Sequence, residues 1–137
     1  MAVVRDLIIT EEDGSISFGN YELDQKAKKS DYEVRGDRYK VKTFRESTRL
    51  ERNDAMVYES EPGTAVLHFK EDENGVSFCV EGPEDAQIIL SLADDTAYRV
   101  FIDGKETGMM ETGMSGKLVL SVEMGETEQV SVKVEKA

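Results

Sequence analysis

Apolar and polar residues alternate along most of this chain, and this period of two limits the fold more than any other feature. Residues 117–124 read KLVLSVEM, with every second residue apolar, and residues 128–135, EQVSVKVE, repeat the pattern. The same alternation runs through residues 75–81, 86–92 and 97–103. Successive side chains of a strand point to opposite faces of its sheet, so each run predicts a strand with one buried and one exposed face. Such strands form sheets that pack on one another.

Turn-forming residues divide the chain into these short runs. They are Gly36-Asp37, Asn53-Asp54, Pro62-Gly63, Asn74-Gly75 and Asp103-Gly104, then a loop bracketed by Gly113 and Gly116, and a last loop that begins at Gly125. Such residues favour hairpin turns because glycine and asparagine tolerate a positive φ. Only residues 21–31, YELDQKAKKSD, suit a short helix. The 137 residues are therefore predicted to form one all-β domain, residues 1–137, an antiparallel β-sandwich of about ten or more short strands joined by hairpins.

The chain contains one cysteine, Cys79, and one histidine, His68. A single thiol cannot form an internal disulfide, and together the two residues exclude the multi-cysteine and two-histidine zinc motifs. No G-x-S-x-G sequence surrounds a serine, so we interpret Cys79 and His68 as structural residues of strands. No apolar run approaches the ~18 residues of a membrane span. We therefore expect a cytoplasmic protein with no cofactor, no metal and no membrane contact.

Acidic residues outnumber basic ones by 29 to 17, which gives a net charge of −12. Many stand in the groups 11–13, 70–75, 83–85 and 93–95, each at a predicted turn, where Asp and Asn serve the backbone. A calcium site built from several of these loops stays open as an alternative, although the EF-hand spacing is absent. A carboxylate pair could also serve glycoside hydrolysis, but the sequence does not identify which acids meet, so we assign no catalytic pair.

Positive charge is concentrated in residues 26–52, which hold ten basic and five acidic residues. The run 38–44, RYKVKTF, alternates, so Arg38, Lys40 and Lys42 share one face of a strand. Lysines on a sheet edge discourage unwanted strand pairing, and this is the simplest interpretation. Two functional interpretations stay open, an acidic surface of a second copy and an anionic ligand such as an anionic glycan. Nucleic acid is disfavoured, because a chain of net charge −12 repels a polyanion elsewhere on its surface.

We expect self-association, and therefore a homo-oligomer, as the role of this segment. The candidate contact residues, for a second copy or for an anionic ligand, are Arg38, Lys40, Lys42, Arg45, Arg49, Arg52 and Tyr39. In a two-fold dimer they would face turn acids of the second copy such as Glu71, Asp72 and Glu73, because each subunit offers the same two patches. Tyr39, Phe44 and Tyr58 are expected to form the apolar centre, since exposed ion pairs contribute only about 0–1 kcal/mol each.

Three methionines, Met109, Met110 and Met114, lie in the glycine-flanked segment 108–116, GMMETGMSG. Flexible thioether side chains at a loop tip can form an adaptable contact surface. The interpretation we favour is that alternate methionines belong to the buried face of a strand.

Three stretches carry a resemblance to known proteins: residues 10–23, TEEDGSISFGNYEL, residues 50–66, LERNDAMVYESEPGTAV, and residues 78–88, FCVEGPEDAQI. Together they resemble a group of small bacterial proteins that commonly carry the name endosialidase, and the resemblance covers nearly the whole chain. That name implies cleavage within polymers of sialic acid. Separately, residues 97–108 and 116–125 are similar to the accessory β-sandwich domains of carbohydrate-active enzymes.

The residues favour a non-catalytic β-sandwich that acts by binding or by self-assembly. The alternative is a small carbohydrate-active, endosialidase-like glycosidase or a module that binds a polyanionic glycan. The two hypotheses differ in one structural requirement, because such an enzyme needs a concave cleft in which two close carboxylates have shifted pKa values.

Overall fold

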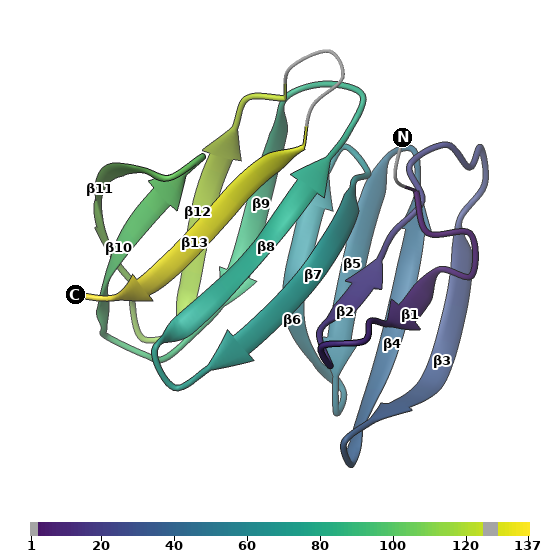
Figure 1. The fold of residues 1–137 in the computed structure, drawn as a ribbon, viewed down its shortest axis with the longest axis horizontal. Coiled ribbons are helices and arrows are strands. Elements are labelled where there is room, and N and C mark those ends of the chain that lie inside the picture. Colours follow the sequence, from purple (N-terminus) through teal and green to yellow (C-terminus); the bar gives the residue numbers. More distant parts are fainter. Residues whose placement is uncertain (1–2, 125–128) are drawn as a thin grey trace.

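The computed structural model describes residues 3–124 and 129–137, and these residues form thirteen strands in two antiparallel sheets (Figure 1). One sheet contains β1 (Ile8–Thr10), β2 (Ile16–Phe18), β7 (Ala65–Asp72), β8 (Gly75–Glu81), β10 (Ala97–Ile102), β11 (Lys105–Glu111) and β13 (Val130–Lys136). The other contains β3 (Ala27–Val34), β4 (Asp37–Phe44), β5 (Ser47–Arg52), β6 (Ala55–Glu61), β9 (Ala86–Ser91) and β12 (Lys117–Val122). The strand orders are β1-β2-β7-β8-β13-β10-β11 and β12-β9-β6-β5-β4-β3. The prediction of an all-β chain with antiparallel sheets in a sandwich is confirmed.

The core lies between the sheets and is built by the alternation seen in the sequence. In β12 and β13 every second residue is buried and its neighbours are exposed. At the centre, the fully buried ring of Tyr58 from β6 meets Phe18 edge-on at 5.3 Å and Phe78 at 5.6 Å, both from the opposite sheet. Edge-to-face aromatic contacts of this kind add to the free energy gained from burial alone. The sheets are therefore joined mainly by apolar packing.

Between β3 and β4 the hairpin turn lies one residue earlier than predicted. Its residues are Arg35 and Gly36, with φ values of 50° and 87°, and Asp37 already belongs to β4. Two successive positive φ values are typical of the type I′ turn, whose twist matches that of the paired strands. The turns expected at Asn53-Asp54 and Asp103-Gly104 are confirmed. The last loop, predicted to begin at Gly125, lies outside the described residues.

The helix predicted within residues 21–31 is wrong. Residues 27–34 form the edge strand β3, which pairs with β4 from Ala27 opposite Thr43 to Val34 opposite Asp37. The segment has no apolar stripe that a helix could bury, and β4 offers it a free sheet edge. A register shift between Lys29 and Tyr32 bends the strand. This strand brings further lysines of the basic segment onto the sheet.

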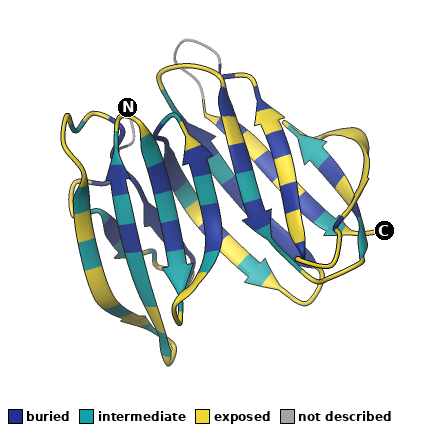
Figure 2. Cartoon of the chain, turned by 180° about the vertical axis from the view of Figure 1, so that it is seen from behind, coloured by how far each residue is buried: buried dark blue, intermediate teal, exposed yellow. Residues whose placement is uncertain are grey.

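The outer face of the six-stranded sheet is open. Figure 2 looks onto this sheet from behind, and no described segment of the chain lies over it. In Figure 1 the turn at residues 45–46 and the loop 82–85 lie at the upper end, with the N-terminus, and the β3–β4 turn lies at the lower end. Within the described residues, no helix has the length and apolar character needed to cross a membrane.

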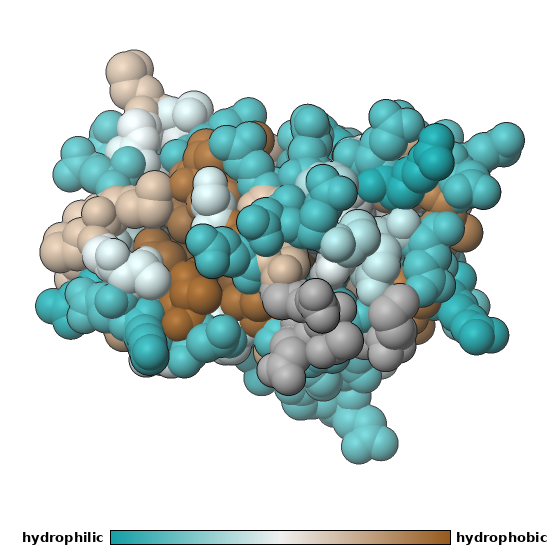
Figure 3. Space-filling model, turned by 90° about the horizontal axis from the view of Figure 1, so that it is seen from above, coloured by the Kyte–Doolittle hydropathy of each residue, from teal (hydrophilic) through white to brown (hydrophobic). Residues whose placement is uncertain are grey.

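The methionines do not belong to the core, so the favoured interpretation of them is wrong. Met109 and Met114 are 59% and 87% exposed, and Met110 is 38% exposed. Met109 and Met110 are exposed because β11 is an edge strand beside β10 and has all seven residues exposed, and Met114 lies in the turn between β11 and β12. Seen from above, apolar atoms gather in the half of the molecule that contains β10 to β13 (Figure 3).

Candidate functional site

The seven predicted contact residues do not form one surface. Lys40 and Lys42 point to the outer face of the six-stranded sheet, as the alternation of β4 predicts, while Val41 and Thr43 between and beyond them are buried. Tyr39 lies on the inner side, where it is the cross-strand partner of Arg52. The basic segment therefore divides into an outer group and an inner group.

The outer group includes a residue that the sequence analysis did not name. Lys28 of β3 is the direct cross-strand partner of Lys42 of β4. Lys40 lies two residues before Lys42 on β4. We call Lys28, Lys40 and Lys42 the lysine patch. None of the described acids lies within ion-pair distance of these three lysines. Like charges directly opposite one another, as Lys28 and Lys42 are, weaken a strand pair. The patch thus concentrates positive charge, with Glu51 as the cross-strand partner of Lys40. The signal for Lys28 was its membership of the basic segment, but the strand assignment was missing.

All four predicted arginines have acidic partners, among them Arg45, which lies 4.0 Å from Asp24. Arg49 contacts Glu51 at 3.1 Å and Glu59 at 3.4 Å on the outer face of the sheet. Arg38 lies 3.7 Å from both Asp31 of β3 and Asp54 of the β5–β6 turn. These arginines therefore have less charge to offer a partner than the lysine patch.

The inner group joins the two sheets. Arg52 forms an ion pair with Glu71 of β7, on the opposite sheet, and Tyr39 hydrogen-bonds to Arg52. Burial raises the pKa of Glu71 despite the adjacent guanidinium, and burial also raises the pKa of Tyr39. Glu71, which was expected to face a second copy, thus has a partner in its own chain.

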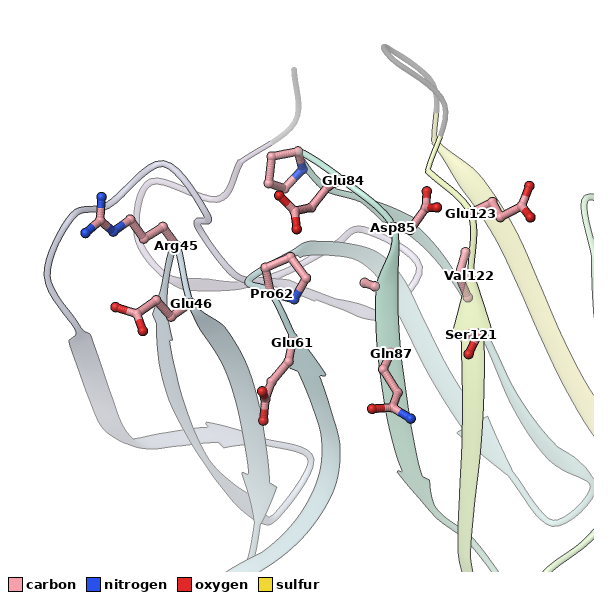
Figure 4. Close-up of a pocket in the computed structure, with 12 residues that line it drawn as sticks. Arg45, Glu46, Glu61, Pro62, Glu84, Asp85, Gln87, Ser121, Val122 and Glu123 are labelled. Carbon is pink, nitrogen blue, oxygen red and sulfur yellow. The ribbon is translucent and has the colours of Figure 1, made fainter.

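Arg45 stands at the rim of a groove of about 960 Å³ on the six-stranded sheet (Figure 4). The groove is lined by the β4–β5 turn, the ends of β6, β9 and β12, and the loop before β9. Its acidic side chains are Glu46, Glu61, Glu84, Asp85 and Glu123. In Figure 4 the carboxylates of Glu61, Asp85 and Glu123 point in different directions, and Asp85 Oδ1 accepts the Met124 N–H at 2.9 Å. The arrangement gives an acidic groove without a convergent carboxylate pair.

The apolar centre predicted for a dimer interface is wrong in two of its three residues. Tyr58 is fully buried, and its hydroxyl lies 2.9 Å from Thr64 Oγ1. Tyr39 faces inward, so neither ring can meet a second copy at the outer face. Phe44 is half-buried at the end of β4, with Lys26 Nζ 5.5 Å from its ring centre. Ile89 and Val119, direct cross-strand partners on the outer face, provide exposed apolar surface instead.

A serine, a histidine and an aspartate do meet, but not as a catalytic triad. Ser15 Oγ donates to Asp13 Oδ1 and lies 3.2 Å from His68 Nδ1. A triad needs the imidazole between the carboxylate and the hydroxyl, so that it can take the proton of the hydroxyl. Here the hydroxyl is in the middle. In the part of the chain that the structure describes, no cluster of three or more His, Cys, Asp or Glu side chains could hold a metal ion.

Fold and surface together define an antiparallel β-sandwich domain with a lysine patch and an acidic groove on one open sheet face. Comparison with family models, with curated proteins and with solved structures finds no match to this chain. The resemblance to the proteins named endosialidase stays a prediction.

Proposed function

We propose that this chain is a non-catalytic β-sandwich that self-assembles through the outer face of its six-stranded sheet. The observation that carries the proposal is the order of charge across this face. Lys42, Arg49 and Glu59 are consecutive cross-strand partners on β4, β5 and β6. Lys28 extends the row on the basic side, and Ile89 extends it on the other. The face thus changes from basic to acidic to apolar.

This order is complementary to itself except at Arg49, which lies on the axis and has ion pairs with Glu51 and Glu59 of its own chain. Lys42 and Glu59 flank Arg49 on either side, so a two-fold axis along β5 exchanges their positions. Two copies laid face to face would then place Glu59 of one against Lys42 of the other, twice. In the same arrangement Lys28 meets Ile89, whose apolar side chain can cover the lysine stem while the ammonium group stays in water. Two sheets can pack in this aligned way.

The acidic groove supports the same partner. It lies at the upper end of β6, β9 and β12, on the same face as the lysine patch. A polyanionic glycan that binds the lysine patch would be repelled by this groove, whereas a second copy places its basic strands β4 and β3 over β6 and β9. Six strands about 4.8 Å apart give a face about 24 Å wide. With strands of six to eight residues, the area of this face is at the low end of the range for a stable interface. We expect a weak dimer that dissociates at high salt, because exposed charges are screened.

Sedimentation velocity over a range of protein concentrations tests the proposal. The wild type should form a dimer at low salt, and Lys28→Glu/Lys40→Glu/Lys42→Glu should be a monomer. The matched control is Lys105→Glu/Lys133→Glu/Lys136→Glu, which changes the net charge equally on the other sheet and should still dimerise.

A charge exchange gives the sharper result. The reversed variant Glu59→Lys/Glu61→Lys should fail to dimerise alone but form a heterodimer with the Lys→Glu variant. A wild type that is monomeric at every concentration overturns the proposal. A dimer that survives the triple lysine change shows that another surface holds it. A monomer that binds a polyanionic glycan through the lysine patch would replace self-assembly with glycan binding.

A further inference from the structure

A small cavity of about 150 Å³ lies between the tips of the β1–β2 and β3–β4 hairpins, at the end of the sandwich opposite the acidic groove (Figure 1). Ile16, Val34 and Phe69 give it an apolar floor. Polar side chains line the rest, and they come from both sheets and from the two hairpin tips. The cavity is smaller than the roughly 300–1,000 Å³ of a typical small-molecule site, so it suits only a group of a few atoms.

The guanidinium of Arg35 lies beside this cavity, in space that Gly14 leaves free because it has no side chain. Gly14 has a φ of 87°, and a Cβ atom on it would lie 1.6 Å from Arg35 Nη2. The guanidinium therefore occupies the space that any larger residue at position 14 would fill. Among the described residues, no carboxylate lies within ion-pair distance of Arg35.

The acids of the lining already have partners. Glu71 is paired with Arg52, and Asp37 Oδ1 accepts a hydrogen bond of 3.0 Å from Asn53 Nδ2. Lys70 Nζ lies 3.5 Å from Asp13 Oδ2, which leaves two of its three protons for other acceptors. The Tyr39 hydroxyl lies beside Arg52 and has a proton to donate. The lining thus has more hydrogen-bond donors than acceptors, and a ligand that accepts hydrogen bonds would suit it.

The partly buried surroundings strengthen the attraction between the cations of the cavity and an anion that enters it. The Arg52 and Glu71 side chains are only 32% and 22% exposed, so water is partly excluded from this end of the sandwich. Attraction between opposite charges increases as the effective dielectric constant falls. We propose that this cavity binds a small oxyanion, a carboxylate or phosphate group, through the Arg35 guanidinium and the Tyr39 hydroxyl.

Amide NMR spectra recorded during titration with inorganic phosphate, and separately with acetate, test this site at constant ionic strength. Saturable shifts are expected at residues 14–16 and 35–39. Arg35→Gln should weaken the binding at least about tenfold, since it removes a charged hydrogen bond. Arg99→Gln, an exposed arginine of β10 on the other side of the molecule, is the control and should bind as the wild type does. Comparison of the two affinities shows whether the site prefers a phosphate group or a carboxylate group.

A second pair of variants keeps the proposal falsifiable if Arg35→Gln is poorly folded. Tyr39→Phe should weaken binding without disturbing the fold, and Gly14→Ala should do so by displacing the guanidinium. Shifts that never saturate with either anion overturn the proposal, as does equal affinity in the wild type, Arg35→Gln and Tyr39→Phe. These results do not depend on whether the chain dimerises, because the cavity is at the opposite end from the groove.

Discussion

Arg52 of β5 and Glu71 of β7 form an ion pair that spans the two sheets at the lower end of the sandwich. Their side chains are 32% and 22% exposed, so water screens the pair only in part. Apolar contacts hold the rest of the core, and Phe69, two residues before Glu71, is among them. The pair therefore marks the place where the core gives way to a polar cavity.

Breaking this pair should destabilise the protein more than removing it. Arg52→Met leaves Glu71 partly buried without its cation, and we expect a loss of about 2 kcal/mol in the free energy of unfolding. The double change Arg52→Met/Glu71→Leu removes both charges and should lose less than the single change. Urea denaturation of the wild type, Arg52→Met, Glu71→Leu and the double variant measures the change in the free energy of unfolding for each substitution. A double variant that is less stable than Arg52→Met would contradict this account.

The pH dependence of stability should reveal Glu71. Its pKa in the fold is raised above the ordinary 4.5 because burial disfavours the carboxylate. Between the pKa of the unfolded state and the higher pKa of the folded state, the folded state therefore binds more protons. The stability that this proton uptake gives is lost as pH rises through the folded pKa. The stability of the wild type relative to Glu71→Gln should fall as pH increases from about 4 to about 7. Glu73→Gln, in the exposed turn, is the control and should show no such trend.

The strands with one apolar face were predictable, because burial alone produces their alternation. β3 was not, since AKKSDYEV alternates in burial but has few apolar residues, and its conformation comes from pairing with β4. The exposure of Met109 and Met110 was equally hidden, because it depends on β11 being an edge strand. A local pattern does not say which strand will be last in its sheet.

The candidate site was predictable only as far as one strand reaches. Alternation placed Lys40 and Lys42 on one face. It could not show that Lys28 stands opposite Lys42, because that depends on the pairing register. The Arg52–Glu71 pair joins strands of different sheets, and no local spacing connects them. Sequence reasoning therefore identified the basic segment but not its division into outer and inner groups.

The Asp13 carboxyl should titrate at unusually low pH. The Ser15 hydroxyl and its backbone N–H both donate to it and lower its pKa to about 2. Ser15→Ala keeps the backbone bond and loses the hydroxyl, so the pKa should rise part of the way to the ordinary 3.8. NMR titration of the side-chain carboxyl carbon measures this. Ser17→Ala, whose hydroxyl donates to Glu11, should leave Asp13 unchanged.

Purified protein incubated with polysialic acid should not shorten the polymer. In the acidic groove the carboxylates of Glu61, Asp85 and Glu123 point apart, so the groove lacks the facing pair of carboxyl groups that most glycoside hydrolases use. Chromatography of the polymer before and after incubation is the measurement. Chain shortening that purifies with the protein, and that is lost in Glu61→Gln, would favour the glycosidase alternative instead.

Neighbouring residues of β13 should respond very differently to the same substitution. Val132 is 1% exposed and lies between Phe78 and Ile102 of the adjacent strands, so Val132→Asp places a charge in the core. We expect a loss of about 4 kcal/mol or more, which is enough to unfold many domains. Lys133 faces outward, and Lys133→Asp should cost less than about 1 kcal/mol, the value of its exposed contact with Glu135. Thermal unfolding of both variants decides the matter, and equal melting temperatures would show that the two residues do not face opposite sides of the sheet.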